Sequence, residues 1–350
     1  MYHTGSGENS TTSIFIALRG VQCTTRIITE VPMKPYSPVL PIVKVAGRHI
    51  PVLFADVNQC FPFRSDNLLL FLSEEFAAHA DWYSSLELSA LDRITVFGDR
   101  DSIVPEASAR TGVACDLIEE NGLVLAGPLG CELLVNADVG LSFTPNTRNP
   151  AKERYAIVLI RHELRHVEDF ARNKLLWGHA FPRQAFKGLR NTSMSLALPL
   201  WQEFYADRGS CDALDQIPVY RTETNLLEHI VWWQEAVKAG PAQALAEHGQ
   251  GLIGMMRKSC ALLGYVLGSE HARTDPRSSE HPLSLAMREI GWTELVERAR
   301  ATLITLHATM PWQDKDCLFD LEEICVAMFE KCGFVLSEDL LGKVTCTPAA

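Results

Sequence analysis

The separation of strand-like from helix-like segments is the feature that most limits how this chain of 350 residues can fold. Short runs rich in apolar and β-branched residues predict strands in the first part of the chain, at 13–18, 21–28, 42–45, 50–55, 93–97, 123–126 and 132–135. In the later part, apolar residues follow a helical spacing instead. Strands that come first and helices that follow indicate an α+β fold with segregated helices.

The helical part opens with Asn149-Pro150, a pair that suits the N-cap and the first position of a helix. From Ile157 on, apolar residues recur at i, i+3, i+7 and i+10, which predicts a helix over 150–174 with one buried face. Further helices are expected at 66–80 with Ser65 as N-cap, and at 199–207, 222–239, 241–268, 282–308 and 316–331. Residues 99–121 and 178–197 are predicted to be loops.

Two regions are predicted from this order of elements. Residues 1–90 form an N-terminal β-rich region with one helix, and residues 91–350 form the main domain with a helical C-terminal part.

Charge and hydropathy exclude several classes of partner. The formal net charge of −11, with no basic run, argues against a nucleic-acid partner, since phosphate binding relies on Lys and Arg. The N-terminus lacks the basic start and long apolar run of a signal peptide, and the apolar stretch at 260–267 is too short to span a bilayer. None of the ten cysteines forms a C-x-x-C pair, which is typical of small buried side chains in a reducing compartment. We therefore expect a cytoplasmic protein with no membrane span.

The sequence Arg161-His162-Glu163-Leu164-Arg165-His166 places H-E-x-x-H inside the predicted long helix. Two histidines four residues apart lie on one helix face, about 6 Å apart along the axis, so both imidazoles can reach one zinc ion. Glu163 lies beside His162 without being needed as a ligand. It can take a proton from a water molecule that the metal activates and deliver it to a leaving amine.

A catalytic zinc site needs a third protein ligand. Asp169 lies about 10 Å from His162 along a straight helix, so we reject it. Glu203 is the better candidate, and Asp207, four residues further on the same helix face, is expected to accept the remaining N–H of a ligand histidine. The sequence thus predicts one zinc ion per chain, held by His162, His166 and Glu203.

These two motifs together resemble the gluzincin metallopeptidases. The stretch from Glu203 to Arg208, Glu-Phe-Tyr-Ala-Asp-Arg, is similar to the E-x-x-A-D-R motif of CAAX-prenyl-endopeptidase-like zinc peptidases, and His281-Pro282 followed by Arg288 is similar to a further element of that family. The soluble ImmA/IrrE-type peptidases share H-E-x-x-H and a glutamate on the next helix. The chain departs from the first family in lacking its transmembrane helices and in the 37-residue gap between His166 and Glu203.

The resemblance implies that residues 91–350 form a zincin-like metallopeptidase domain with a mainly helical C-terminal half. In such a domain a small mixed or antiparallel sheet packs on the H-E-x-x-H helix and on a second helix, here the one that carries Glu203. The resemblance also implies His281 as a donor to the developing oxyanion, although His281 can equally be the cap of the helix that begins at Pro282. An edge strand, either 123–126 or 132–135, is expected to bind an extended peptide.

Peptide deformylases combine a Gly-Cys motif with a later H-E-x-x-H, which raises Cys131 as another ligand. The Leu-Ser that follows their cysteine is absent here, so we do not assign Cys131 to the metal.

The predicted function is zinc-dependent hydrolysis of peptide bonds in a peptide or protein substrate. Two alternatives stay open: a zinc hydrolase of a non-peptide amide, and a non-catalytic regulatory or binding protein that zinc stabilises.

Overall fold

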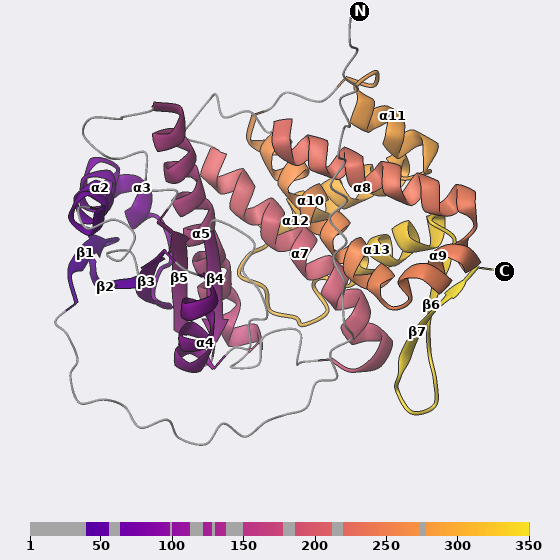
Figure 1. The fold of residues 1–350 in the computed structure, drawn as a ribbon, viewed down its shortest axis with the longest axis horizontal. Coiled ribbons are helices and arrows are strands. Elements are labelled where there is room, and N and C mark those ends of the chain that lie inside the picture. Colours follow the sequence, from indigo (N-terminus) through magenta and orange to yellow (C-terminus); the bar gives the residue numbers. More distant parts are fainter. Residues whose placement is uncertain are drawn as a thin grey trace, which may run out of the picture. The chain divides into compact units, whose positions relative to one another are not determined.

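The computed structural model describes residues 40–55, 64–98, 100–112, 122–127, 130–137, 150–177, 186–211, 220–273 and 278–349. These residues form an α+β structure with eleven helices and two sheets, in which helix predominates (Figure 1). The strands predicted at 13–18 and 21–28 lie outside the described residues.

The larger sheet has five strands in the order β1-β2-β3-β5-β4. Strands β1 (Ile42–Val45) and β2 (Arg48–Ala55) form the predicted hairpin, and its two turn residues, Ala46 and Gly47, both have positive φ, as a tight hairpin turn requires.

The remaining strands of this sheet make it mixed. Strand β3 (Leu91–Phe97) runs parallel to β2, and β5 (Gly130–Asn136) runs parallel to β3. Strand β4 (Gly122–Gly127) pairs antiparallel with β5 and forms an edge of the sheet. All three strands predicted here are confirmed. Because β2 pairs with β3, residues on both sides of position 90 contribute to one sheet.

Helices α2 (Arg64–Ala78), α3 (Ala80–Ser84) and α4 (Arg100–Thr111) accompany this sheet. Helix α2 confirms the predicted helix but begins at Arg64, so Ser65 lies inside it. Helix α4 shows that the loop predicted over 99–121 was wrong for 100–111. The polar composition and Pro105 did not predict a helix here. Ile103 and Ala107, one turn apart, are buried with Phe97 in a small core that holds the helix in place.

Helix α5 (Pro150–Trp177) is the predicted long helix, and it begins at the predicted proline. It packs on β4 and β5 and also against α7 (Gly188–Cys211), which lies beside it in Figure 1. The loop predicted over 178–197 was therefore wrong for 188–197. Helix α7 starts well before Pro199, and in its first turn the N–H of Leu189 donates a hydrogen bond to the carboxylate of Glu338, 149 residues away. Met194 and Leu196 in the same stretch are buried in the core.

The remaining helices pack with α7 into a second core of their own. They are α8 (Tyr220–Ala239), α9 (Pro241–His248), α10 (Gly251–Arg273), α11 (Pro282–Glu289), α12 (Thr293–Ala308) and α13 (Phe319–Lys331). The predicted helical blocks are confirmed, but two of them are broken, at Gly249 and at Gly291, where φ is positive. A C-terminal hairpin of β6 (Phe334–Glu338) and β7 (Val344–Pro348) was not predicted.

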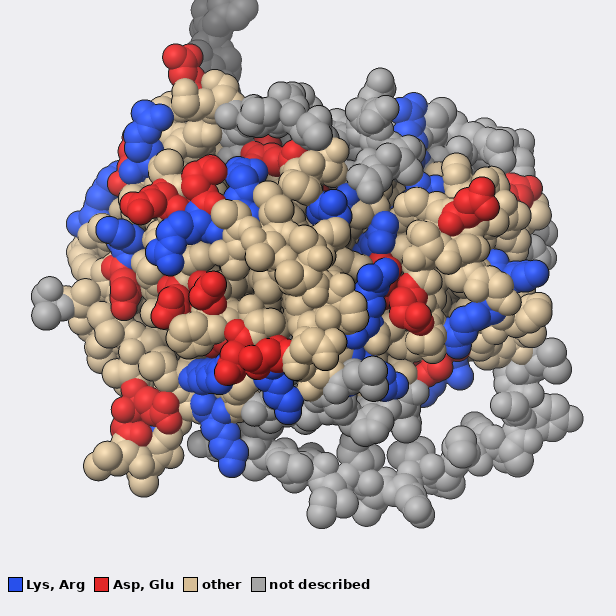
Figure 2. Space-filling view, turned by 180° about the vertical axis from the view of Figure 1, so that it is seen from behind, with Lys and Arg blue, Asp and Glu red and all other residues tan. Residues whose placement is uncertain are grey.

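Two features of the described residues bear on partners. None of their helices is long and apolar enough to cross a membrane. On the face shown in Figure 2, acidic and basic side chains are interspersed rather than gathered by sign. This face therefore lacks, among the described residues, the extended basic surface that nucleic-acid binding relies on.

Candidate metal centre

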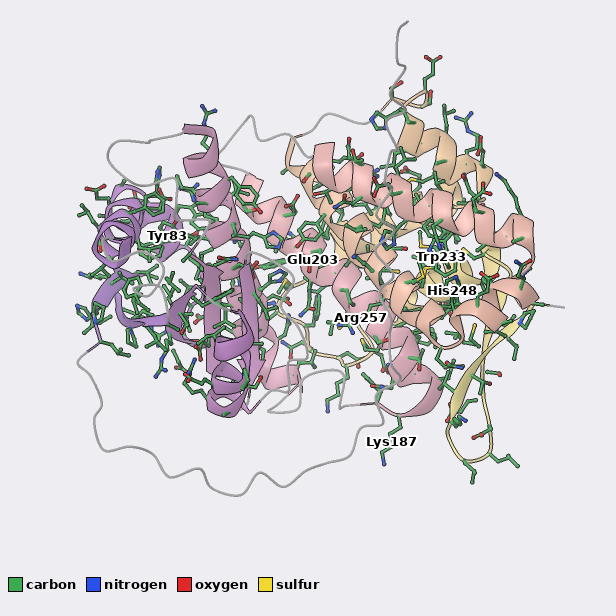
Figure 3. The ribbon with its side chains drawn as sticks, viewed as in Figure 1. Tyr83, Lys187, Glu203, Trp233, His248 and Arg257 are labelled. Atoms are coloured by element: carbon green, nitrogen blue, oxygen red, sulfur yellow. The ribbon has the colours of Figure 1, made fainter. Side chains whose placement is uncertain are left out.

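The two histidines of H-E-x-x-H meet on the face of α5 that looks toward α7. Their Nε2 atoms are 3.0 Å apart, and their rings stand nearly perpendicular, with centroids 4.7 Å apart. Helix α7 crosses this face and brings Glu203 to it, with Oε2 3.1 Å from His162 Nε2 and 3.5 Å from His166 Nε2. The label of Glu203 in Figure 3 marks the place. The three side chains form a group able to hold a metal ion, as the sequence predicted.

The donor atoms fit a zinc ion in type and spacing. Tetrahedral zinc with bonds of about 2.0–2.2 Å separates its ligand atoms by about 3.4 Å. The three separations measured here, 3.0, 3.1 and 3.5 Å, lie close to that value. Two imidazoles and one carboxylate also match the ligand set of catalytic zinc sites, which leave one position open. The side chains of His166 and Glu203 retain 15% and 18% exposure, so the group is not sealed on all sides.

The electrostatics of the group favour a positive charge at its centre. Burial disfavours the charged form of both imidazoles, yet nearby carboxylates outweigh burial and raise the pKa of His162 and His166. For His162 these carboxylates are Asp207, Glu203 and Glu163. Burial alone would raise the pKa of Glu203, but the two imidazoles hold it well below its usual range. The carboxylates therefore attract a positive charge, which a divalent cation can supply in place of a proton.

Asp207 lies where the sequence predicted it. Its Oδ1 is 3.6 Å from Nδ1 of His162, the ring nitrogen that faces away from Glu203. Its Oδ2 accepts a short hydrogen bond from the hydroxyl of Ser269 on α10. This arrangement favours the tautomer of His162 that leaves Nε2 free for a metal.

Glu163 lies against β4, at the edge of the sheet. It is buried, and a Cβ atom on Gly122, the first residue of β4, would come within 2.8 Å of its Oε1 atom. A larger residue at Gly122 would therefore push this carboxylate away from its present position beside the strand. The candidate base thus lies between the metal ligands and the edge strand.

Asp169, which we rejected as a ligand, has a structural role. Its Oδ1 accepts hydrogen bonds from Nε1 of Trp201 at 2.9 Å and from Nδ2 of Asn173 at 2.8 Å. Burial raises the pKa of this carboxyl to about 6, against the lowering effect of those donors. The bond to Trp201 fastens α5 to α7 one turn away from His166.

Three residues of α10 belong to the surroundings of the centre and were not found in the sequence. The ring of Tyr265 stacks on His162, with centroids 5.1 Å apart and planes inclined by 10°. Gly264 lets α10 approach α7 closely, because an added Cβ would come within 2.4 Å of the carbonyl oxygen of Leu200. The third is Ser269, which binds Asp207. The G-x-x-x-G spacing of Gly264 and Gly268 was the available signal.

The structure places His281 and Cys131 in other settings. His281 is the N-cap of α11: its Nδ1 accepts from the N–H of Leu283 at 3.3 Å, and its Nε2 lies 3.7 Å from a carboxylate oxygen of Glu223. These are the contacts of a helix cap, and a role in oxyanion binding stays a prediction. Cys131 is buried in β5, outside the three-residue group, and burial raises the pKa of its thiol.

Of the two strands expected to bind a peptide, only β4 lies at an edge of the sheet that the described residues form. Strand β5 pairs with β3 on one side and with β4 on the other, so it has no edge to offer. The proposal for 132–135 was therefore wrong, and 123–126 stays the candidate.

Comparisons of the chain with protein families, with curated proteins and with solved structures find no match. The functional argument therefore depends on the geometry of this site.

Proposed function

We propose that this chain is a zinc-dependent hydrolase with a zincin-like arrangement, and that it cleaves peptide bonds. The observation that supports this proposal best is the meeting of His162, His166 and Glu203 at donor separations suited to zinc. Asp207 beside His162 adds the carboxylate that often orients a zinc-bound histidine.

Zinc bound by these residues would polarise the scissile carbonyl and lower the pKa of a water molecule. The chain itself supplies the proton transfers. The carboxylate of Glu163 takes the proton of the attacking water and then donates it to the leaving amine. Burial of Glu163 keeps its side chain in one place between the ligands and β4.

A peptide substrate is favoured over another amide by the position of β4. This edge strand begins at Gly122, next to Glu163, so an extended chain that adds to the sheet edge would run past the base. Backbone hydrogen bonds to an edge strand require a polypeptide, whereas a small amide has no use for them.

The test measures zinc content and peptide turnover on one preparation of the full chain. Glu163→Gln should retain one zinc per chain and the thermal stability of the parent, while cleavage of a mixed peptide library falls ~10²–10⁴-fold. Glu203→Ala should lose most of the zinc, because it removes a ligand. A Glu163→Gln protein that cleaves as fast as the parent would refute the proposed mechanism. A parent that holds zinc but cleaves no peptide would favour the non-peptide or the non-catalytic alternative.

A further inference from the structure

We propose that α10 positions the metal centre through Tyr265 and Ser269, two side chains that belong to neither metal-binding motif. This inference depends on the proposed centre, since it concerns how His162 is held for a metal. Tyr265 and Ser269 lie four residues apart on α10 and therefore share one face of that helix.

Contact between α7 and α10 brings this face to the site. A Cβ on Gly264 would lie 2.4 Å from the carbonyl oxygen of Leu200, and one on Gly268 would lie 2.7 Å from that of Phe204. Contacts advance along both helices together, so α7 and α10 run parallel at this crossing. The two glycines allow backbone-to-backbone contact, which brings Glu203 within 3.0 Å of the Cβ position of residue 264.

Tyr265 restricts the ring of His162 by covering one of its faces. The two rings are nearly parallel, inclined by 10°, with centroids 5.1 Å apart. His166 meets the same imidazole edge-to-face at 4.7 Å. An imidazole otherwise turns broadly about its terminal torsion, so these two contacts select the ring plane that points Nε2 at Glu203.

Ser269 restricts the same ring through Asp207. Its buried hydroxyl donates to Oδ2 of Asp207, which leaves Oδ1 facing Nδ1 of His162 at 3.6 Å. A carboxylate held at one oxygen can present the other in a fixed direction. Ser269 of α10 therefore orients Asp207, and Asp207 in turn orients the ring of His162.

If these side chains only stabilised the fold, replacing them would affect stability but not metal binding. If Ser269 only stabilised helix packing, its replacement would lower stability and leave metal affinity unchanged. Ser259 offers the matched control: it is also buried on α10, but its hydroxyl donates to the Met255 carbonyl and accepts a bond from Trp233. Ser259→Ala should therefore show what a lost buried hydroxyl does away from the metal.

The experiment measures zinc affinity of the full chain by competition with a chromogenic chelator, and the visible spectrum after cobalt replaces zinc. Ser269→Ala and Tyr265→Leu should each weaken zinc binding ~10-fold, the lower end for outer partners of metal ligands, and should shift the cobalt bands. Tyr265→Phe, which keeps the ring, and Ser259→Ala should bind zinc within ~2-fold of the parent.

The following results would contradict the positioning roles of Ser269 and Tyr265. Parent-like affinity and spectrum in both Ser269→Ala and Tyr265→Leu would overturn the positioning role. Equal losses in Tyr265→Phe and Tyr265→Leu would overturn the stacking part, and a loss in Ser259→Ala equal to that in Ser269→Ala would overturn the Asp207 part. A parent that binds no zinc overturns the proposed function itself, a result distinct from all of these.

Discussion

Replacing Gly264 by alanine tests how closely the metal ligands depend on the contact between α7 and α10. The new Cβ would lie 2.4 Å from the carbonyl oxygen of Leu200, whereas ordinary contact begins at 3.4 Å. Since the obstacle is backbone, α7 must move away by about 1 Å, taking Glu203 with it. Overpacking of this kind costs about 1–3 kcal/mol, and better helix propensity returns about 0.5–1 kcal/mol. We expect Gly264→Ala to lower the free energy of unfolding by up to about 2.5 kcal/mol.

The displacement matters more for the metal than for the fold, because ligand sets tolerate errors of only about 0.5 Å. Gly264→Ala should therefore weaken zinc binding at least ~10-fold, measured by chelator competition beside a urea unfolding curve. Gly254→Ala is the control on the same helix: nothing lies within 4 Å of its Cβ position, so stability should rise by about 0.5–1 kcal/mol with zinc affinity unchanged. Unchanged affinity in Gly264→Ala would refute the reasoning.

Two further predictions concern stability alone. Glu75 accepts hydrogen bonds from the buried guanidinium of Arg161 and from the Tyr83 hydroxyl. Because Glu75→Gln leaves the charge of Arg161 unpaired, it should lower the free energy of unfolding in urea by about 3–5 kcal/mol. Glu74→Gln, at an exposed position, should change it by no more than about 0.5 kcal/mol, and equal losses in the two variants would contradict the pairing. Burial, aided by nearby guanidinium groups, lowers the pKa of His307 to about 4. Because the pKa of His307 is lower in the folded chain, the unfolded chain binds the proton first as the pH falls below about 6.5. The free energy of unfolding therefore decreases between about pH 6.5 and pH 4, by at most about 3 kcal/mol and by less because His307 is partly exposed. His307→Gln should flatten the dependence of unfolding free energy on pH in that window, and an unchanged slope would rule His307 out.

The elements that sequence patterns predicted are those whose stability is local. The long helix begins at its proline and carries a continuous apolar face, so its start was predicted at the right residue. The hairpin of β1 and β2 has a turn that tolerates positive φ, and its position was predicted as well. In both cases the information lies within a few residues of the element.

The wrong predictions of secondary structure concern segments that make contacts with residues far away in the sequence. Residues 188–197 carry many hydroxyl and amide side chains, which compete for the backbone and predict a loop. In the folded chain Glu338 accepts a bond from the N–H of Leu189, and Ser193 bonds the carboxylate of Glu322 across to α13. These partners lie more than 120 residues away, and no local window contains them.

The same division applies to the candidate metal centre. His162 and His166 are four residues apart, so helix geometry alone brings them together, and Glu203 could be chosen by residue type and resemblance. The side chains of α10 that hold these three residues in position could not be predicted from residue type, spacing or resemblance.

A tyrosine and a serine on a helix usually pack or face solvent. Tyr265 and Ser269 become part of the centre only because two glycines admit α10 to the surface of α7. Where backbones touch, no side chain can adjust its rotamer to absorb a shift, so the distance between two helices is transmitted directly to Glu203. The spacing of the candidate ligands thus depends on the contact of α7 with α10, a helix that carries neither motif. Substitutions of the α10 glycines should therefore affect metal binding as strongly as those at Asp207.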